Sequence, residues 1–266
     1  MSQMPYGFFH PRVVRVEHVS PTLRRVVLGG QEIAGVVSGG LDQRLKIFLP
    51  HPGQDAPVLP DVLDLDWYAR WRQLDPDVRG IMRTYTVRAV RQDPPELDID
   101  FALHGDLGPA SRWAQHARPG DRLSLLAPVV ADNGGVDFRP PEDTDWILLT
   151  ADVTALPALA AILGSLPPGT PVRAFIGVPH PDDRIALPTE ADARISWDPA
   201  DLTTAAFPPG TPYAWLAGEA ATVRGQRRHL VNDRGFSRAA VTFSGYWRRG
   251  TTEDDLLEAA AAEAAA

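Results

Sequence analysis

The sequence predicts two consecutive domains of different fold class: an antiparallel six-stranded β-barrel over residues 1–130, then a parallel-sheet α/β domain over residues 143–266. Three observations lead to this prediction. Short segments of β-branched or alternating apolar residues, separated by Pro, Gly and Asp, fill the first half of the chain. Strand and helix patterns alternate in the second half. The length of 266 residues suits two modest domains at ~100–200 residues each.

The barrel strands are predicted from six short segments in the first half. They are 13–19, 22–28, 43–49, 83–89, 96–103 and 122–127. A long Pro- and Asp-rich stretch, 52–80, separates the third segment from the fourth, and a loop of this length is expected to be functional or partly helical. We expect a helix from about 109 to 117, because Pro109 suits a first helical turn.

The second half follows a segment, 129–144, that we interpret as the interdomain linker. Predicted strands lie at 146–150, 173–178, 195–197, 213–217 and 239–244. Apolar residues at i, i+3, i+4 and i+7 predict a helix over 156–163, and a second helix is predicted over 220–232. The Ala- and Glu-rich tail, 254–266, is expected to be a C-terminal helix. This alternation predicts a parallel sheet with helices on both faces.

The composition excludes several kinds of chemistry. The chain has no cysteine, which removes disulfides, thiolate nucleophiles and cysteine-ligated metals. The formal net charge, 26 − 34 = −8, argues against nucleic-acid binding. We see no secretory signal and no stretch near the ~18 apolar residues of a membrane span, so we expect a soluble cytoplasmic protein. The seven histidines lack metal-ligand spacing, so we predict no metal site and chemistry supplied by a bound cofactor.

Two segments of the first domain together suggest a cofactor site. On a strand over 83–88, Arg83 and Tyr85 would face one side, and Thr84 and Thr86 the other. A flat ring stacked on Tyr85 with a phosphate near Arg83 would suit this strand. About 20 residues later, the glycine turn that leads into the helix at Pro109 offers free backbone N–H groups to a diphosphate. The alternatives are an ordinary barrel strand and a plain strand–turn–helix junction.

Three segments of the second domain end strands and therefore point to a ligand-binding edge. Residues 151–157 follow the first strand, although no G-x-G-x-x-G is present, and Asp152 or Thr154 could equally be a helix N-cap. Gly218 and Glu219 follow a later strand. The aromatic pair of 245–250 could shield a flat cofactor, or its Trp could pack on the C-terminal helix. Three arginines on the helix over 220–232 could meet a phosphate or form a solvated face: Arg224, Arg227 and Arg228.

Five motifs in family order resemble the siderophore-interacting proteins, also called ferric-siderophore reductases, of the ferredoxin–NADP reductase-like superfamily. They are RTYTVR (83–88), DFALHGDLGPASRWA (100–114), ADVTALPA (151–158), WLAGEA (215–220) and GYWRRG (245–250). The first motif marks only the wider superfamily, whereas the second and fifth are more specific. Family members often have an acidic residue where this chain has Val153, which leaves the role of that carboxylate open here.

The resemblance implies noncovalent FAD in the barrel domain and NAD(P)H in the α/β domain, with the chemistry carried by FAD and no catalytic side chain. The residues implied for FAD are Arg83, Thr84, Tyr85, Thr86, Asp100, Phe101, Leu103, His104, Gly105, Gly108, Pro109, Ala110 and Ser111. Those implied for the nucleotide are Asp152, Thr154, Ala155, Gly218 and Glu219, with Tyr246 and Trp247 as further cofactor contacts.

The implied reaction is reduction of Fe(III) in a siderophore to Fe(II), by a monomer, with NAD(P)H or reduced ferredoxin as donor. Two alternatives stay open: a general flavin reductase with another acceptor, and a flavin-bearing siderophore-binding protein fed electrons by a partner. The identity of the siderophore and the choice of donor are also open.

The chain's single lysine suggests where the substrate binds. The chain has 25 arginines and one lysine, Lys46, which lies on the third predicted strand. By resemblance that strand borders the open face over the flavin, where basic residues would attract anionic ferric chelates. We expect Lys46 to form the substrate patch with Arg112, Arg248 and Arg249. The alternative is that Lys46 is a lysine on the barrel surface by chance and has no role in binding.

Overall fold

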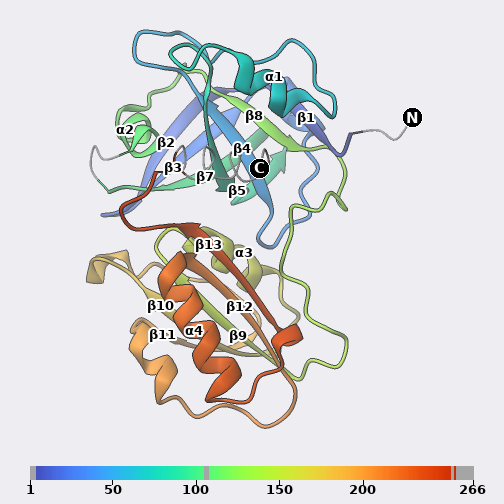
Figure 1. Ribbon diagram of the computed structural model, residues 1–266, viewed down its shortest axis with the longest axis vertical. Coiled ribbons are helices and arrows are strands. Elements are labelled where there is room, and N and C mark those ends of the chain that lie inside the picture. Colours follow the sequence, from blue (N-terminus) through green and yellow to red (C-terminus); the bar gives the residue numbers. More distant parts are fainter. Residues whose placement is uncertain (1–3, 105–107, 253–254, 256–266) are drawn as a thin grey trace, which may run out of the picture. The chain divides into compact units, whose positions relative to one another are not determined.

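The computed structural model divides into two compact units, Met1–Asp137 (unit 1) and Phe138–Ala266 (unit 2) (Figure 1). It describes residues 4–104, 108–252 and 255. Each unit has its own sheets and its own hydrophobic core, so each is described by itself.

Unit 1 consists of two four-stranded antiparallel sheets. The first has the strand order β1 (Tyr6–Phe9), β8 (Ser124–Pro128), β4 (Arg44–Leu49) and β5 (Ile81–Thr86). The second has the order β2 (Arg12–Ser20), β3 (Leu23–Gly29), β7 (Pro95–Ala102) and β6 (Ala89–Gln92). Thus β5 is an edge strand, paired with β4 alone among the described strands of its sheet.

The antiparallel character of this domain is confirmed, but the predicted six-stranded barrel is not. The described residues of unit 1 form eight strands in two sheets, and two of these strands, β1 and β6, were not predicted. Each is four residues long, too short for alternation to be visible in the sequence. The segment predicted as one strand over 83–89 is also divided, since β5 ends at Thr86 and Arg88 donates its backbone N–H to Asp98 O at 2.9 Å.

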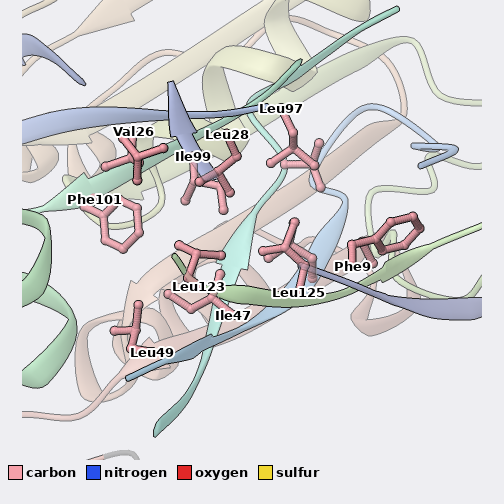
Figure 2. Close-up of a cluster of buried hydrophobic side chains, with 14 of the residues drawn as sticks. Phe9, Val26, Leu28, Ile47, Leu49, Leu97, Ile99, Phe101, Leu123 and Leu125 are labelled. Carbon is pink, nitrogen blue, oxygen red and sulfur yellow. The ribbon is translucent and has the colours of Figure 1, made fainter. Parts of the chain in front are cut away.

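The two sheets enclose the core of unit 1. In Figure 2, the side chains of Val26 and Leu28 on β3 and of Ile99 on β7 point toward those of Ile47 on β4 and Leu125 on β8. All five are fully buried. These residues alternate with more exposed neighbours, which is why the sheets have one apolar face each.

Two helices complete unit 1. Helix α1 (Trp67–Gln73) lies within the long stretch between β4 and β5, so the expectation of a partly helical segment is confirmed. The buried Trp71 ties α1 to the chain just before β5, because its indole N–H donates to Gly80 O at 3.0 Å. Helix α2 (Pro109–His116) buries Ala110, Ser111 and Ala114 and agrees with the predicted helix to within one residue. A short 3₁₀ helix, η1 (Gln31–Gly35), follows β3.

Part of the segment predicted as linker packs onto unit 1. The Asn133 side chain exchanges hydrogen bonds with the Gln43 side chain at 2.9 and 3.0 Å. Both oxygens of Asp137 accept from the Arg44 guanidinium at 2.7 and 3.0 Å. These contacts explain why unit 1 extends to Asp137.

Unit 2 is built on a five-stranded parallel sheet, as predicted. Its strand order is β11 (Asp192–Ser196), β10 (Pro171–Gly177), β9 (Trp146–Asp152), β12 (Pro212–Glu219) and β13 (Val241–Trp247). Helix α3 (Leu156–Ser165) packs against β9, and α4 (Ala220–Asn232) packs against β12 and β13; Figure 1 shows α4 in front of the sheet and α3 behind it. The described residues of unit 2 also form three 3₁₀ helices: η2 (Pro181–Asp183), η3 (Pro199–Thr203) and η4 (Arg238–Ala240).

The strand order fixes where unit 2 can bind a ligand. The chain proceeds from β9 to β10 on one side and later returns to β12 on the other side of β9. The carboxyl ends of β9 and β12 therefore flank a topological switch point, where open α/β sheets bind ligands. Asp152 and Glu219 are the last residues of these two strands.

The predicted C-terminal helix over 254–266 lies, apart from Asp255, outside the described residues. Within the part of the chain that the structure describes, no helix is long and apolar enough to cross a membrane. The same residues contain no group of three or more His, Asp or Glu that could hold a metal ion.

Candidate functional site

Strand β5 presents a cation and an aromatic ring on the same face. Arg83 and Tyr85 alternate with Thr84, and their cross-strand partners on β4 are the buried Ile47 and Leu45. Arg83 is 7% exposed, and its guanidinium donates to Met82 O at 2.7 Å. A buried guanidinium at a ligand-binding edge is well suited to a phosphate, because charge-assisted hydrogen bonds strengthen away from water.

Aromatic rings connect β5 to α2. The rings of Tyr85 and Phe101 have centroids 4.4 Å apart, and those of Phe101 and Trp113 are 5.7 Å apart. Phe101 is fully buried, whereas Tyr85 and Trp113 are half-buried. The row fixes the orientation of Tyr85. Trp113 was not singled out by the sequence; the spacing of α2 alone does not show that it meets Phe101.

Helix α2 begins after a glycine. Its N-cap is Gly108, which has no side chain with which to cap the helix. The nearby Ser111 hydroxyl instead accepts the backbone N–H of His104 at 3.1 Å. The predicted residues Gly108, Pro109 and Ala110 thus form a helix start that can receive an anion. Gly105 lies outside the described residues.

Asp100 and Thr86, two further predicted cofactor residues, are buried. Asp100 accepts from Arg25 through both carboxylate oxygens at 2.7 and 2.9 Å, and Arg88 lies 3.8 Å away. Asp100 precedes Phe101 on β7, so their side chains lie on opposite faces of the strand. The structure therefore gives Asp100 protein partners, while Leu103 continues the chain beyond β7 toward the exposed His104.

Lys46 and Thr84 lie directly opposite each other on β4 and β5, facing away from the core. The Lys46 ammonium donates to the Thr84 hydroxyl at 2.6 Å. They occupy the face opposite to Arg83 and Tyr85. Because β5 is an edge strand, a ligand along its free edge would meet side chains from both faces.

In unit 2, the Asp152 carboxylate joins three strand ends. Its Oδ1 accepts from Thr154 N at 2.9 Å, from the Thr154 hydroxyl, and from Ala155 N at 3.3 Å. Its Oδ2 accepts from Glu219 N and from Trp247 Nε1, both at 2.8 Å. The ends of β9, β12 and β13 thus meet at one carboxylate. The predicted nucleotide-binding residues on these strands therefore lie close together, as a shared site would require.

Gly218 and Glu219 are shaped by the same contact. Gly218 has a φ of 141°, and a Cβ built there would lie 2.7 Å from Asp152 Oδ2. Only glycine fits such a conformation at such a close approach. Glu219 is the N-cap of α4 and accepts Thr222 N at 2.8 Å. Hydrogen bonds from the backbone N–H groups of Thr222, Ala221 and Arg249 lower the pKa of Glu219 to about 2.

The remaining predicted residues lie at the end of β13. Trp247 is 39% exposed and is positioned by Asp152, Tyr246 is half-buried, and Arg248 and Arg249 are exposed. Of the three α4 arginines, Arg227 stacks on the exposed Phe243 ring, 4.6 Å from its centroid.

Comparisons with known proteins identify the family. Models of the siderophore-interacting FAD-binding domain and of the siderophore-interacting protein match residues 12–132 and 144–250. Ferric vibriobactin reductase ViuB of Vibrio cholerae is 30% identical over 94% of this chain and 93% of its own. The NADPH-dependent ferric-chelate reductase of Escherichia coli is 29% identical over 88% and 91%. The solved siderophore-interacting protein SipS from Aeromonas hydrophila is 33% identical, with a TM-score of 0.75 over 97% and 98%.

The chain belongs to the siderophore-interacting protein family. The predicted family is therefore confirmed, and so are FAD as a cofactor and flavin oxidoreductase as the class of enzyme.

The residues of unit 1 in this siderophore-interacting protein fit FAD. The buried Arg83 and the start of α2 at Gly108 can neutralise phosphate charge, and Tyr85 offers a ring face on the same strand as Arg83. Ile81 on β5 and Pro109 on α2 line one cavity, so the strand and the helix start are neighbours. The other lining residues include Arg12, His51 and Arg122, which are scattered in the sequence and carry no motif.

Proposed function

We propose that this siderophore-interacting protein reduces the Fe(III) of a siderophore with electrons from NAD(P)H, and that it releases Fe(II) in the cytoplasm as a monomer. The observation that carries the proposal is the face of β5, where the buried Arg83 and the ring of Tyr85 lie on the strand next to the start of α2. The names of two relatives, a ferric vibriobactin reductase and an NADPH-dependent ferric-chelate reductase, support it.

The reaction needs few protein groups, because the bound flavin carries the electron transfer. Bound FAD supplies the change from two-electron to one-electron transfer. One NAD(P)H therefore becomes NAD(P)⁺, two Fe(III) become two Fe(II), and one proton is released. The chelator holds Fe(II) more weakly, so the metal leaves. Arg83 and the α2 amides hold phosphate, Tyr85 orients the flat ring, and Lys46 attracts the anionic ferric chelate at the outer face of β4.

The nucleotide would bind at the switch point of unit 2. There Asp152 is already saturated by protein donors, so its role is to position Glu219, Thr154 and Trp247. Trp247 and the backbone around Gly218 would contact the nucleotide. Glu219 carries a negative charge at the start of α4, where a dinucleotide diphosphate is commonly held. This one observation favours a second candidate donor, reduced ferredoxin, with the same flavin and iron chemistry.

Anaerobic stopped-flow spectroscopy tests the proposal. The flavin should be bleached by NADH or NADPH, and then reoxidised with two equivalents of a ferric siderophore. Bleaching by reduced ferredoxin alone would establish the second donor. Rapid reoxidation by quinones or dioxygen, with no response to ferric catecholate, hydroxamate or carboxylate complexes, would instead indicate a general flavin reductase.

Lys46→Ala tests the substrate patch. The KM for an anionic ferric siderophore should rise about two- to fivefold, the equivalent of an exposed charge pair worth ~0.5–1 kcal/mol. FAD content should stay that of the wild type. Arg72→Ala, which removes the same charge from an exposed position on α1, is the matched control. Equal KM values for Lys46→Ala and wild type would remove Lys46 from the site.

A further inference from the structure

The last helix and strand of unit 2 carry a charge opposite to that of the rest of the chain. Residues 219–250, which contain α4, η4 and β13, include seven arginines and two acidic residues, a formal charge of 7 − 2 = +5. Because the whole chain has a formal charge of −8, the rest of it sums to −8 − 5 = −13. Such an asymmetry creates a local positive potential on an acidic protein, and this potential attracts anionic partners.

The arginines of this segment differ from those of unit 1 in their lack of acidic partners. In unit 1, several arginines pair with carboxylates, as Arg25 does with Asp100 at 2.7 Å. Among the described residues, six arginines of residues 219–250 form no ion pair: Arg224, Arg227, Arg228, Arg238, Arg248 and Arg249. Five of the six are exposed. The seventh, Arg234, donates to backbone carbonyl groups of η3 and the residues after it.

The arginines of α4 lie on one side of the helix and adjoin β13. Arg224, Arg227 and Arg228 have the i, i+3, i+4 spacing of a single helix face. The Arg227 guanidinium lies over the ring of Phe243 on β13, 4.6 Å from its centroid. Figure 1 shows α4 beside β13, which is an edge strand, paired with β12 alone among the described strands of its sheet. We call Arg224, Arg227, Arg228 and Phe243 the α4–β13 surface.

The aromatic rings of β13 indicate that the partner is a protein. Phe243 is 45% exposed, and exposed aromatic rings together with arginines are typical of the energetic centre of protein interfaces. Phe243 is covered by Arg227, and Trp247 is held by its hydrogen bond to Asp152. Rings fixed by polar groups are poorly placed to insert into a lipid layer, which membrane binding of this kind requires. The planar guanidinium groups match carboxylates, so the partner should be acidic.

We propose that the α4–β13 surface binds the acidic face of a small one-electron carrier protein of the ferredoxin class. This inference rests on the second donor of the proposed function, and it gives that donor a docking site. Two reduced carriers would each be oxidised by one electron while two Fe(III) become two Fe(II), so the reaction balances without a proton. It also assigns the three α4 arginines to a protein partner rather than to a nucleotide phosphate.

Binding of an acidic two-iron ferredoxin to the FAD-loaded protein tests this inference. Its Kd is measured by isothermal titration calorimetry for wild type, Arg228→Glu and Arg194→Glu. Arg194 is an exposed arginine on β11, at the opposite edge of the same sheet, and its reversal changes the net charge by the same amount. Arg228→Glu should weaken binding about five- to thirtyfold, because it replaces attraction by repulsion, and Arg194→Glu less than about twofold. The wild-type Kd should rise as the ionic strength increases from about 0.05 to about 0.5 M, because salt screens exposed charges.

The outcomes separate the docking surface from the function on which it rests. A wild-type flavin that neither NAD(P)H nor reduced ferredoxin bleaches would contradict the flavin reductase itself. Wild type that binds no ferredoxin, or equal Kd values for Arg228→Glu and Arg194→Glu, would overturn only the docking surface.

Two further results would assign the arginines to another partner and so overturn the inference. A raised KM for NADPH in Arg228→Glu, with unchanged ferredoxin binding, would place Arg228 at the nucleotide. Co-sedimentation of wild type with phosphatidylserine vesicles, lost in Arg228→Glu and without ferredoxin binding, would identify a lipid surface. Arg224→Glu is a second variant of the same surface, should Arg228→Glu not fold.

Discussion

Trp247 donates its indole N–H to the Oδ2 of Asp152 at 2.8 Å, although the two residues are 95 positions apart. The same oxygen accepts the backbone N–H of Glu219, and the other oxygen of Asp152 accepts from Thr154 and Ala155. The carboxylate thus links the ends of three parallel strands at the point where an open α/β sheet binds its ligand.

Asp152→Asn should destabilise unit 2. An amide has one oxygen, so the variant leaves either the Glu219 and Trp247 donors or the Thr154 and Ala155 donors without an acceptor. We expect a loss of about 1–3 kcal/mol in the free energy of unfolding. Urea denaturation followed by tryptophan fluorescence measures it. Asp182→Asn, whose side chain is 77% exposed, should leave stability unchanged. Equal stability of the two variants would contradict the structural role of Asp152.

Trp247→Phe separates two roles of this tryptophan. It removes the donor to Asp152 but keeps a ring, so we expect a loss of about 1 kcal/mol in stability. FAD content should be unchanged, because the match to the FAD-binding domain, residues 12–132, lies in unit 1. A lower flavin-to-protein ratio in the purified variant would show instead that the ring covers the flavin.

Gly218→Ala should be destabilising for two reasons. The backbone has a φ of 141°, which costs about 1–3 kcal/mol with a side chain. The new Cβ would also lie 2.7 Å from Asp152 Oδ2. Thermal melting should show the loss. Gly225→Ala is the matched control, because a Cβ there meets no atom within 4 Å on α4; alanine is also the better helix former, so a neutral or slightly raised melting temperature is expected.

Arg83→Ala should weaken FAD binding. The variant removes a buried guanidinium, and the loss of its charge-assisted hydrogen bonds should weaken FAD at least about tenfold. FMN should be weakened as well, because Arg83 is assigned the phosphate that both flavins share. Retention of wild-type flavin content by Arg83→Ala would contradict the site.

The lowered pKa of Glu219 should make the stability of the protein sensitive to acid. Its pKa falls from an ordinary value of 4.5 to about 2 in the folded protein. A lowered carboxylate pKa stabilises the fold above the unfolded-state value, and this stabilisation is lost as the pH falls through the folded-state value. The free energy of unfolding of wild type should therefore fall between about pH 4.5 and pH 2, and that of Glu219→Gln should fall less. Parallel pH profiles for the two proteins would contradict this role.

The sequence identified those parts of the fold that local pattern controls. The bounds of α4 agree with the predicted 220–232 to the residue, because an amphipathic segment bounded by a capping residue is a local feature. The alternation of strand and helix gave the parallel sheet of unit 2. The five motifs together predicted the siderophore-interacting protein family, since they depend on residue types at fixed spacing.

The tertiary structure decided what depends on pairing between distant segments. β1 and β6 are strands only because β8 and β7 pair with them; four residues have no periodicity of their own. Asp100 belongs to a motif from which a cofactor contact was predicted. In the structure its carboxylate accepts a hydrogen bond from Arg25, its cross-strand partner in the β3–β7 pair. The partners of Asp152 lie 67 and 95 residues away, and the lining of the cavity beside Arg112 comes from four segments of unit 1. Such contacts follow from strand order and register. The order and register are set by how the whole domain buries its sheet faces, so no single segment of the sequence determines them.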